Sequence, residues 1–127
     1  MNRLSLSLLT LLTIGCFTTG PSGAQTSNPA DGQLAYNNNC RTCHSLDEGD
    51  NRLGPNLHQI VGRKAAAASG YGYSSAFKSA DFEWTTEKLD QFIADPNAVV
   101  PGNNMKPYSG IADAKVRSAI VEHLKSQ

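Results

Sequence analysis

Two cysteines and a histidine lie within five consecutive residues of this chain, Cys40-Arg41-Thr42-Cys43-His44. The pattern is C-x-x-C-H, in which the two thiols can form thioether bonds with the two vinyl groups of one porphyrin. The histidine then stands over the ring, where an imidazole nitrogen can bind iron. The pattern therefore predicts one covalently attached haem c.

Two other sites use a closely spaced cysteine pair, namely a thioredoxin-like redox motif and half of a zinc site. A zinc site takes further ligands, and a thioredoxin-like motif lies near a βαβ pattern. No second cysteine pair follows Cys43, and no βαβ pattern surrounds the motif. The sequence favours haem attachment over both.

The N-terminus has the features of an exported protein. Arg3 precedes a largely apolar run over residues 4–17, which is too short for a spanning helix of about 20 residues. Ser22-Gly23-Ala24 places small residues where a signal peptidase reads them. We therefore predict a signal peptide at residues 1–24 and a periplasmic monohaem domain at residues 25–127, since bacteria attach haem to C-x-x-C-H outside the cytoplasm.

Cys16 allows an alternative to simple export. Thr13-Ile14-Gly15-Cys16 partly resembles a lipoprotein cleavage box, although such a box usually has an aliphatic residue where Thr13 stands. With a lipid on Cys16, the Thr-, Gly-, Ser- and Pro-rich residues 18–28 would form a tether. We expect membrane attachment only in that case.

Charge and length restrict the function further. The 127 residues include 11 basic and 11 acidic side chains, and loss of Arg3 with the signal peptide leaves one more acid than base. This near-neutral balance does not indicate nucleic-acid binding. The remaining chain suits one small domain with a limited apolar core, which a buried haem would enlarge. We expect a monomer.

Helices joined by long loops account for the rest of the chain. Asn28 and Pro29 are typical of a helix start, with Gly32 and Tyr36 on one face, and Asn37 to Asn39 are expected to loosen that helix. A second helix is predicted from near Thr85 to Asp95-Pro96, with Leu89, Phe92 and Ile93 facing inward. A third is predicted from near Asp113, with Val116, Ile120 and Leu124 on its apolar stripe. Residues 54–81 form a long loop that a haem would organise.

Three residues are candidates for the sixth iron ligand: Met105, His58 and His123. Met105 is the only methionine that remains after Met1 leaves with the signal peptide. A single methionine is more often core filler than a ligand, but the turn-rich Pro101-Gly102-Asn103-Asn104-Met105 argues against a core role. Either histidine is more often structural or exposed than a ligand.

Over residues 32–124 the chain resembles a class I cytochrome c of the mitochondrial-type and bacterial soluble monohaem branch. The resemblance lies in the C-x-x-C-H motif, in Gly54-Pro55-Asn56-Leu57-His58, in Gly62-Arg63-Lys64 and at Met105. It implies an all-α cytochrome c fold, with about three main helices and long loops wrapped around one covalent haem.

The resemblance also implies roles for individual residues. Cys40 and Cys43 would carry the haem, with His44 and Met105 as the axial iron ligands. The carbonyl of Pro55 would accept a hydrogen bond from the other nitrogen of His44, which fixes the ring. Arg63, Tyr73 and Trp84 would hold the haem propionates. Asn103 would do the same, at a position where the family often has threonine.

The chain departs from the mitochondrial pattern at residues that would affect the reduction potential of the haem and the docking of a redox partner. Phe92 stands where that branch has a tyrosine bonded to the ligand sulfur, and His123 replaces an aromatic residue between the first and last helices. Asn97, Ala98 and Asn104 stand where it carries docking lysines. The resemblance thus predicts a haem site but does not identify the partner.

The function predicted is electron transfer between redox proteins by transient docking, without a substrate site. One alternative is that the protein serves a single periplasmic dehydrogenase or oxidase, as its subunit or as its electron acceptor. In that case it could also be tethered by a lipid. A gas sensor or peroxidase-like enzyme with a labile sixth ligand is the third possibility, against which the loop ending at Met105 argues.

Overall fold

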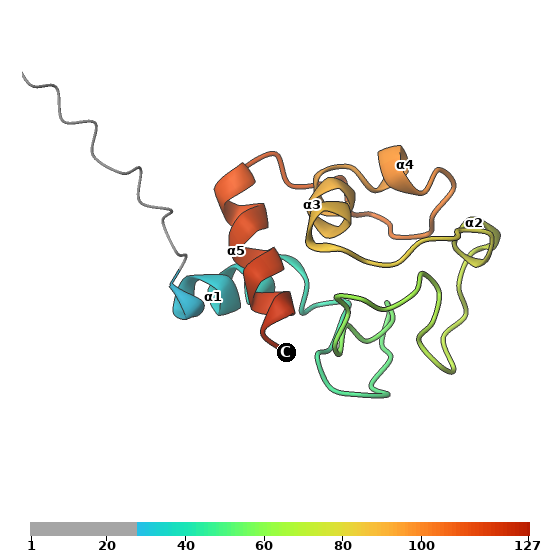
Figure 1. Ribbon diagram of the computed structural model, residues 1–127, viewed down its shortest axis with the longest axis horizontal. Coiled ribbons are helices and arrows are strands. Elements are labelled where there is room, and N and C mark those ends of the chain that lie inside the picture. The colour runs from blue at the N-terminus through green and yellow to red at the C-terminus, as the bar shows by residue number, and fades with distance from the viewer. Residues whose placement is uncertain (1–27) are drawn as a thin grey trace, which may run out of the picture.

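The computed structural model describes residues 28–127; the predicted signal peptide at residues 1–24 and Cys16 lie outside this range. Over these residues the chain forms five helices joined by long loops and no strand (Figure 1). An isolated antiparallel bridge joins Lys64 to Glu83. No helix within residues 28–127 has the length and apolar character to cross a lipid bilayer.

Three helices are long, as predicted: α1 (Pro29–Asn39), α3 (Thr86–Ala94) and α5 (Ala114–Lys125). Side-chain caps explain where two of them begin. The Thr85 hydroxyl accepts a hydrogen bond from the Lys88 amide at 3.1 Å, and the Asp113 carboxylate accepts one from the Lys115 amide at 2.8 Å. Such caps satisfy amides that have no partner in the first helical turn.

Two short helices were not predicted, α2 (Ser75–Lys78) and α4 (Pro96–Val99). The predicted stop at Asp95-Pro96 is correct, because α3 ends at Ala94. The same aspartate also begins α4, since its carboxylate accepts hydrogen bonds from the amides of Asn97 and Ala98 at 3.0 and 3.3 Å. Proline is tolerated at a first helical position, so a break in one helix serves as the start of another.

The end of α1 differs from the prediction. Asn37 to Asn39 were expected to loosen the helix, but α1 continues through Asn39. The Asn39 side-chain amide donates to the Ala35 carbonyl at 2.8 Å, and the Tyr36 carbonyl accepts from the amides of Cys40 and Arg41. These bonds satisfy the terminal carbonyls, so the helix leads directly into the C-x-x-C-H segment.

The first and last helices pack against each other at one end of the molecule (Figure 1). Gly32 allows this close contact, because a Cβ atom there would lie 2.8 Å from the Ala119 carbonyl oxygen and 3.0 Å from the His123 Cβ. The core centres on α5, where Ile120 is fully buried and Leu124 is 2% exposed. The Arg117 Nε atom bonds the Asp90 carboxylate at 2.9 Å and so links α5 to α3.

The long loops occupy the side of the molecule below α3 and α4, drawn in green in Figure 1. Residues 45–74 form this part, which is held by side-chain bonds between loops. The Asn51 side chain donates to the Ser69 carbonyl at 2.8 Å, and the Tyr71 hydroxyl donates to the Leu53 carbonyl at 2.8 Å. The loop that a haem was predicted to organise is thus also held by side-chain bonds to residues 51 and 53.

Candidate functional site

The C-x-x-C-H segment is a compact turn that continues from α1. The Tyr36 carbonyl accepts from the Cys40 amide at 2.8 Å, and the Cys40 carbonyl accepts from the amides of Cys43 and His44 at 3.1 and 3.0 Å. As a result, both thiols and the imidazole line the same cavity. Burial raises the pKa of the Cys40 thiol to about 12, so the unmodified side chain is protonated.

The His44 ring is fixed by its neighbours. Its Nδ1 atom lies 2.7 Å from the Pro55 carbonyl oxygen, and because a carbonyl can only accept, Nδ1 carries the proton. The Nε2 lone pair is therefore free to bind a metal. Gly54 makes room for the ring, since a Cβ there would lie 2.6 Å from Nδ1. Burial lowers the pKa of His44 more than the Pro55 bond raises it, which favours the neutral, ligating form.

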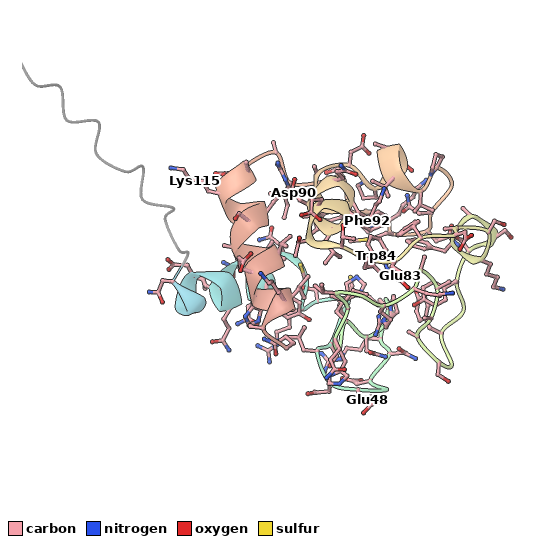
Figure 2. All side chains as sticks on the ribbon, viewed as in Figure 1. Glu48, Glu83, Trp84, Asp90, Phe92 and Lys115 are labelled. Carbon is pink, nitrogen blue, oxygen red and sulfur yellow. The ribbon has the colours of Figure 1, made fainter. Side chains whose placement is uncertain are left out.

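A cavity of about 340 Å³ lies between the loops and α3. Its lining is mostly apolar and aromatic, which suits a flat hydrophobic ring system. Figure 2 shows Trp84 and Phe92 side by side within this part of the molecule, with ring centroids 5.1 Å apart. Both residues line the cavity, as do Tyr73, Phe77 and Tyr108.

Of the three candidates for a sixth ligand, Met105 alone lines the cavity. His58 is turned toward another loop, where its Nδ1 atom lies 3.2 Å from the Leu46 carbonyl oxygen. His123 packs against Tyr36, with ring centroids 5.5 Å apart. The structure thus brings Met105 to the same cavity as His44 and leaves both histidine alternatives outside it.

Asn103 shapes the loop that carries Met105. Its Oδ1 atom accepts from the Met105 amide at 3.0 Å, and its Nδ2 atom donates to the Asn97 Oδ1 and the Val100 carbonyl at 3.1 and 2.9 Å. The side chain is 2% exposed and does not line the cavity. These contacts support a role in the placement of Met105, and the propionate contact that the resemblance implied for Asn103 stays a prediction.

Arg63 carries a charge without an anionic partner among residues 28–127. Its two terminal nitrogens bond the Asn56 side chain, the Asn56 carbonyl and the His58 carbonyl at 2.6–3.2 Å. Its Nε atom is buried and has no hydrogen-bond partner in this part of the chain. Because a buried N–H of a charged group is costly without a partner, this half-buried arginine has capacity for an acidic group in the cavity that it lines.

Backbone pairing places Trp84 next to Arg63. The Trp84 amide donates to the Arg63 carbonyl at 2.9 Å, and the Gly62 amide donates to the Trp84 carbonyl at 2.7 Å. Tyr73 lies nearby on the cavity wall, and its hydroxyl oxygen accepts from the Ala68 amide at 3.2 Å. The three residues assigned to propionates by resemblance therefore share one cavity.

The comparisons with known proteins agree with this arrangement. A family described as "Cytochrome C oxidase, cbb3-type, subunit III" matches residues 27–124. The chain is 35% identical to "Cytochrome c-type cyt cy" of Rhodobacter capsulatus over 101 residues, which are 80% of this chain but only 50% of that protein. It is 36% identical to "Cytochrome c2 iso-2" of Magnetospirillum molischianum over 68% of this chain and 89% of that one.

A solved structure, "cytochrome cH from Methylobacterium extorquens", superposes with a TM-score of 0.72 at 37% identity. The match covers 79% of this chain and 99% of that one. The chain belongs to the class I cytochrome c family. The predicted cytochrome c fold is therefore confirmed, together with haem c as its cofactor and electron transfer as its function.

The residues of this cytochrome fit the haem. The two thiols and the imidazole line one cavity, whose apolar walls suit the ring, and the unpartnered Arg63 Nε suits a propionate. Cys40 and Cys43 would hold the group covalently, and His44 and Met105 would be the candidate ligands of its iron. The bond between His44 and the Pro55 carbonyl, expected from the resemblance, is present.

Several site residues were not found from the sequence. Leu53, Tyr71, Phe77 and Tyr108 line the cavity of this cytochrome, and Asn56 holds the Arg63 side chain. Local periodicity carries no signal for residues in irregular loops, because their neighbours are distant in sequence. The Tyr36 hydroxyl was also missed, although the four-residue step from Tyr36 to Cys40 places both on one side of the helix end.

Proposed function

We propose that this cytochrome carries one electron on a haem with His44 and Met105 as axial ligands and with no substrate site. The observation that carries this proposal is the position of Met105, the candidate that lines the same cavity as His44. When bound, the haem iron supplies one-electron chemistry between ferrous and ferric states. With His44 and Met105 both bound to the iron, no coordination position would remain for a substrate.

The surrounding residues support this role. The apolar and aromatic walls suit the haem ring, and the Asn103 side chain fixes the backbone at Met105. Arg63, Tyr73 and Trp84 are proposed to hold the propionates, with the free Nε of Arg63 as the charged donor. Methionine ligation favours the ferrous state, so the reduction potential is expected toward the high end for haem proteins.

Replacement of Met105 tests the axial assignment. Met105→Ala should abolish the ferric absorption band of sulfur-bound haem, lower the reduction potential and open the iron to CO. His58→Gln is the matched control, because it changes a rejected candidate that lies outside the cavity, and it should keep the band. Survival of the band in Met105→Ala would show that the ligand is not Met105.

We also propose that residues 1–24 are a cleaved signal peptide, that residues 25–127 form the domain, and that the domain acts as a monomer in the periplasm. The support is the short apolar run behind Arg3 and the small residues at 22–24. The mass of the protein purified from cells should equal residues 25–127 plus one haem. A mass that includes a lipidated Cys16 would instead place the protein on the membrane.

The second candidate is a dedicated subunit or acceptor of a respiratory complex. The name of the matching family, which refers to subunit III of an oxidase, favours this alternative. Size-exclusion chromatography of a gentle extract from the native host separates the two. A carrier elutes as a free monomer, whereas a subunit elutes with an oxidase or dehydrogenase.

A further inference from the structure

Tyr36 contacts the C-x-x-C-H segment at both of its ends. Its carbonyl oxygen accepts from the amides of Cys40 and Arg41 at 2.8 and 3.2 Å. Its hydroxyl group reaches past the turn and donates to the His44 carbonyl at 3.1 Å. One residue of α1 therefore holds both the beginning and the end of the segment that carries the haem.

The hydroxyl contact is buried. Tyr36 is 3% exposed and His44 is 7% exposed, so water does not readily replace the bond. Burial also raises the pKa of Tyr36 to about 12, so the hydroxyl stays protonated and remains a donor. A buried carbonyl that loses its donor bears the full cost of desolvation, which makes the bond significant for the conformation of His44.

The tyrosine ring is itself held from the opposite helix. The His123 ring of α5 lies against it at 5.5 Å and an interplanar angle of 46°. Gly32, one turn earlier on α1, lets α5 approach closely. The position of the hydroxyl is thus set by the packing of α1 on α5, and side-chain rotation is restricted.

We propose that the Tyr36 hydroxyl is a positioning group for the axial histidine. His44 is then held at two points, with its carbonyl fixed by Tyr36 and its imidazole fixed by the Pro55 carbonyl. This inference rests on the ligation proposed above. It means that the packing of α1 on α5 affects how strongly the His44 imidazole donates electrons to the iron.

The expected effect on the haem follows from the 2.7 Å bond between Nδ1 and the Pro55 carbonyl. A strong bond at Nδ1 makes the imidazole a better electron donor, which stabilises ferric iron. Without the Tyr36 hydroxyl the backbone at His44 gains freedom, and the Nδ1 bond weakens on average. The ferric state then loses stabilisation, so the reduction potential rises.

Tyr36→Phe tests the proposal, because phenylalanine keeps the ring packing and removes only the hydroxyl. Amide hydrogen exchange in the ferric haem protein should accelerate about tenfold at His44 and Gly54, relative to Leu89 and Phe92 in α3. The Gly54 amide is informative because it donates to the Cys43 carbonyl at 2.8 Å. The reduction potential of the same sample should rise above that of the parent.

Tyr108→Phe is the matched control for exchange. Tyr108 is another partly buried tyrosine whose hydroxyl donates to a backbone carbonyl, that of Ile93, at 2.6 Å. Loss of the Tyr108 hydroxyl should accelerate amide exchange near the end of α3. The ratio of the amide exchange rate at His44 to that at Leu89 should stay unchanged. Acceleration at His44 in both variants to the same extent would overturn the proposal, because it would reflect general loss of stability.

Failure of this inference is distinguishable from failure of the ligation. If Tyr36→Phe changes neither the exchange at His44 nor the potential, while Met105→Ala still loses its sulfur band, the positioning role alone is wrong. If Met105→Ala keeps the band, the proposed ligation is wrong whatever Tyr36→Phe does. A potential that falls in Tyr36→Phe also overturns the positioning role.

Discussion

Phe92 is a residue at which a single oxygen atom should change the redox chemistry. Its side chain is 7% exposed and lines the cavity together with Met105. No hydroxyl is present at this position to donate to the methionine sulfur. Tyr108 does not supply one, because its hydroxyl already donates to the Ile93 carbonyl.

We therefore predict that Phe92→Tyr raises the reduction potential by about 20–60 mV, the equivalent of one modest hydrogen bond. A hydroxyl that donates to the sulfur withdraws electron density from the iron and destabilises the ferric state. Redox titration measures the shift. Phe92→Leu is the control for altered packing, and an equal shift in both variants would contradict a role for the hydroxyl.

At the scale of single residues, the sequence predicted which side chains could carry the haem better than it predicted which atoms each side chain contacts. The C-x-x-C-H spacing identified Cys40, Cys43 and His44 without any structure, because the chemistry itself requires that spacing. Asn103 shows the limit. The resemblance implied a propionate contact for this residue, which stays a prediction, but it did not indicate that the Asn103 amide holds the backbone of Met105 and the end of α4. Which of two hydrogen-bond partners a buried amide takes depends on loop geometry.

At the scale of helices, the contact between α1 and α5 contains a titratable group. His123 packs against Tyr36 of α1, whose hydroxyl stays protonated, while its neighbours Glu122 and Lys125 lie 3.9 Å apart in an exposed pair. Burial of the ring lowers the pKa of His123 below its ordinary value of 6.5. The neutral ring is therefore favoured in the folded protein.

This shift predicts a loss of stability in mild acid. Between the lowered folded pKa and about 6.5 the unfolded chain binds more protons, so the free energy of unfolding rises with pH. The contribution is fully present above about 6.5 and is lost as the pH falls through the folded pKa. Denaturant unfolding at pH 7 and pH 5 should show a smaller difference for His123→Gln than for the parent. Equal differences would contradict the prediction.

Helix positions were predicted well where a cap or a proline marks the boundary. Thr85, Asp113 and Asp95-Pro96 each give a local signal, and α3 and α5 begin or end beside them. The predicted end of α1 was wrong. Three asparagines are poor helix formers, yet the Asn39 side chain and the bonds from the next two amides to the Tyr36 carbonyl keep them helical. The two four-residue helices escaped notice because they are too short to show a period.

At the scale of the whole molecule, charge gives little guidance to a partner. Basic and acidic residues balance at 11 each, and Figure 2 shows acidic residues on different parts of the molecule, with Glu48 on the loops and Asp90 on α3. The fold could be predicted because the haem motif, the glycines and the three helices belong to one family pattern. The walls of the cavity could not, since they are built from loops that only the folded chain brings together.

An exposed apolar side chain, that of Leu53, lies at the cavity. Leu53 is 77% exposed and lines the cavity, and its carbonyl is held by the Tyr71 hydroxyl, so the loop presents the side chain on a fixed backbone. Its neighbour Arg52 is paired with Asp50 at 2.8 Å, and Asn97, Ala98 and Asn104 are exposed and uncharged. Apolar contact at Leu53 is therefore expected to contribute to docking near the haem, beside the exposed Lys106, which also lines the cavity.

Electron self-exchange between ferrous and ferric copies of the protein tests this expectation, with NMR line broadening as the measurement. Leu53→Ser should slow self-exchange about three- to tenfold, because part of a leucine side chain is no longer buried in the encounter complex. Leu34→Ser is the control, since Leu34 is also exposed, at 59%, but does not line the cavity.

The parent rate should change little with added salt, because steering by charge is weak when charges balance. A steep salt dependence, or equal slowing by both substitutions, would show that docking depends on charge or on another face.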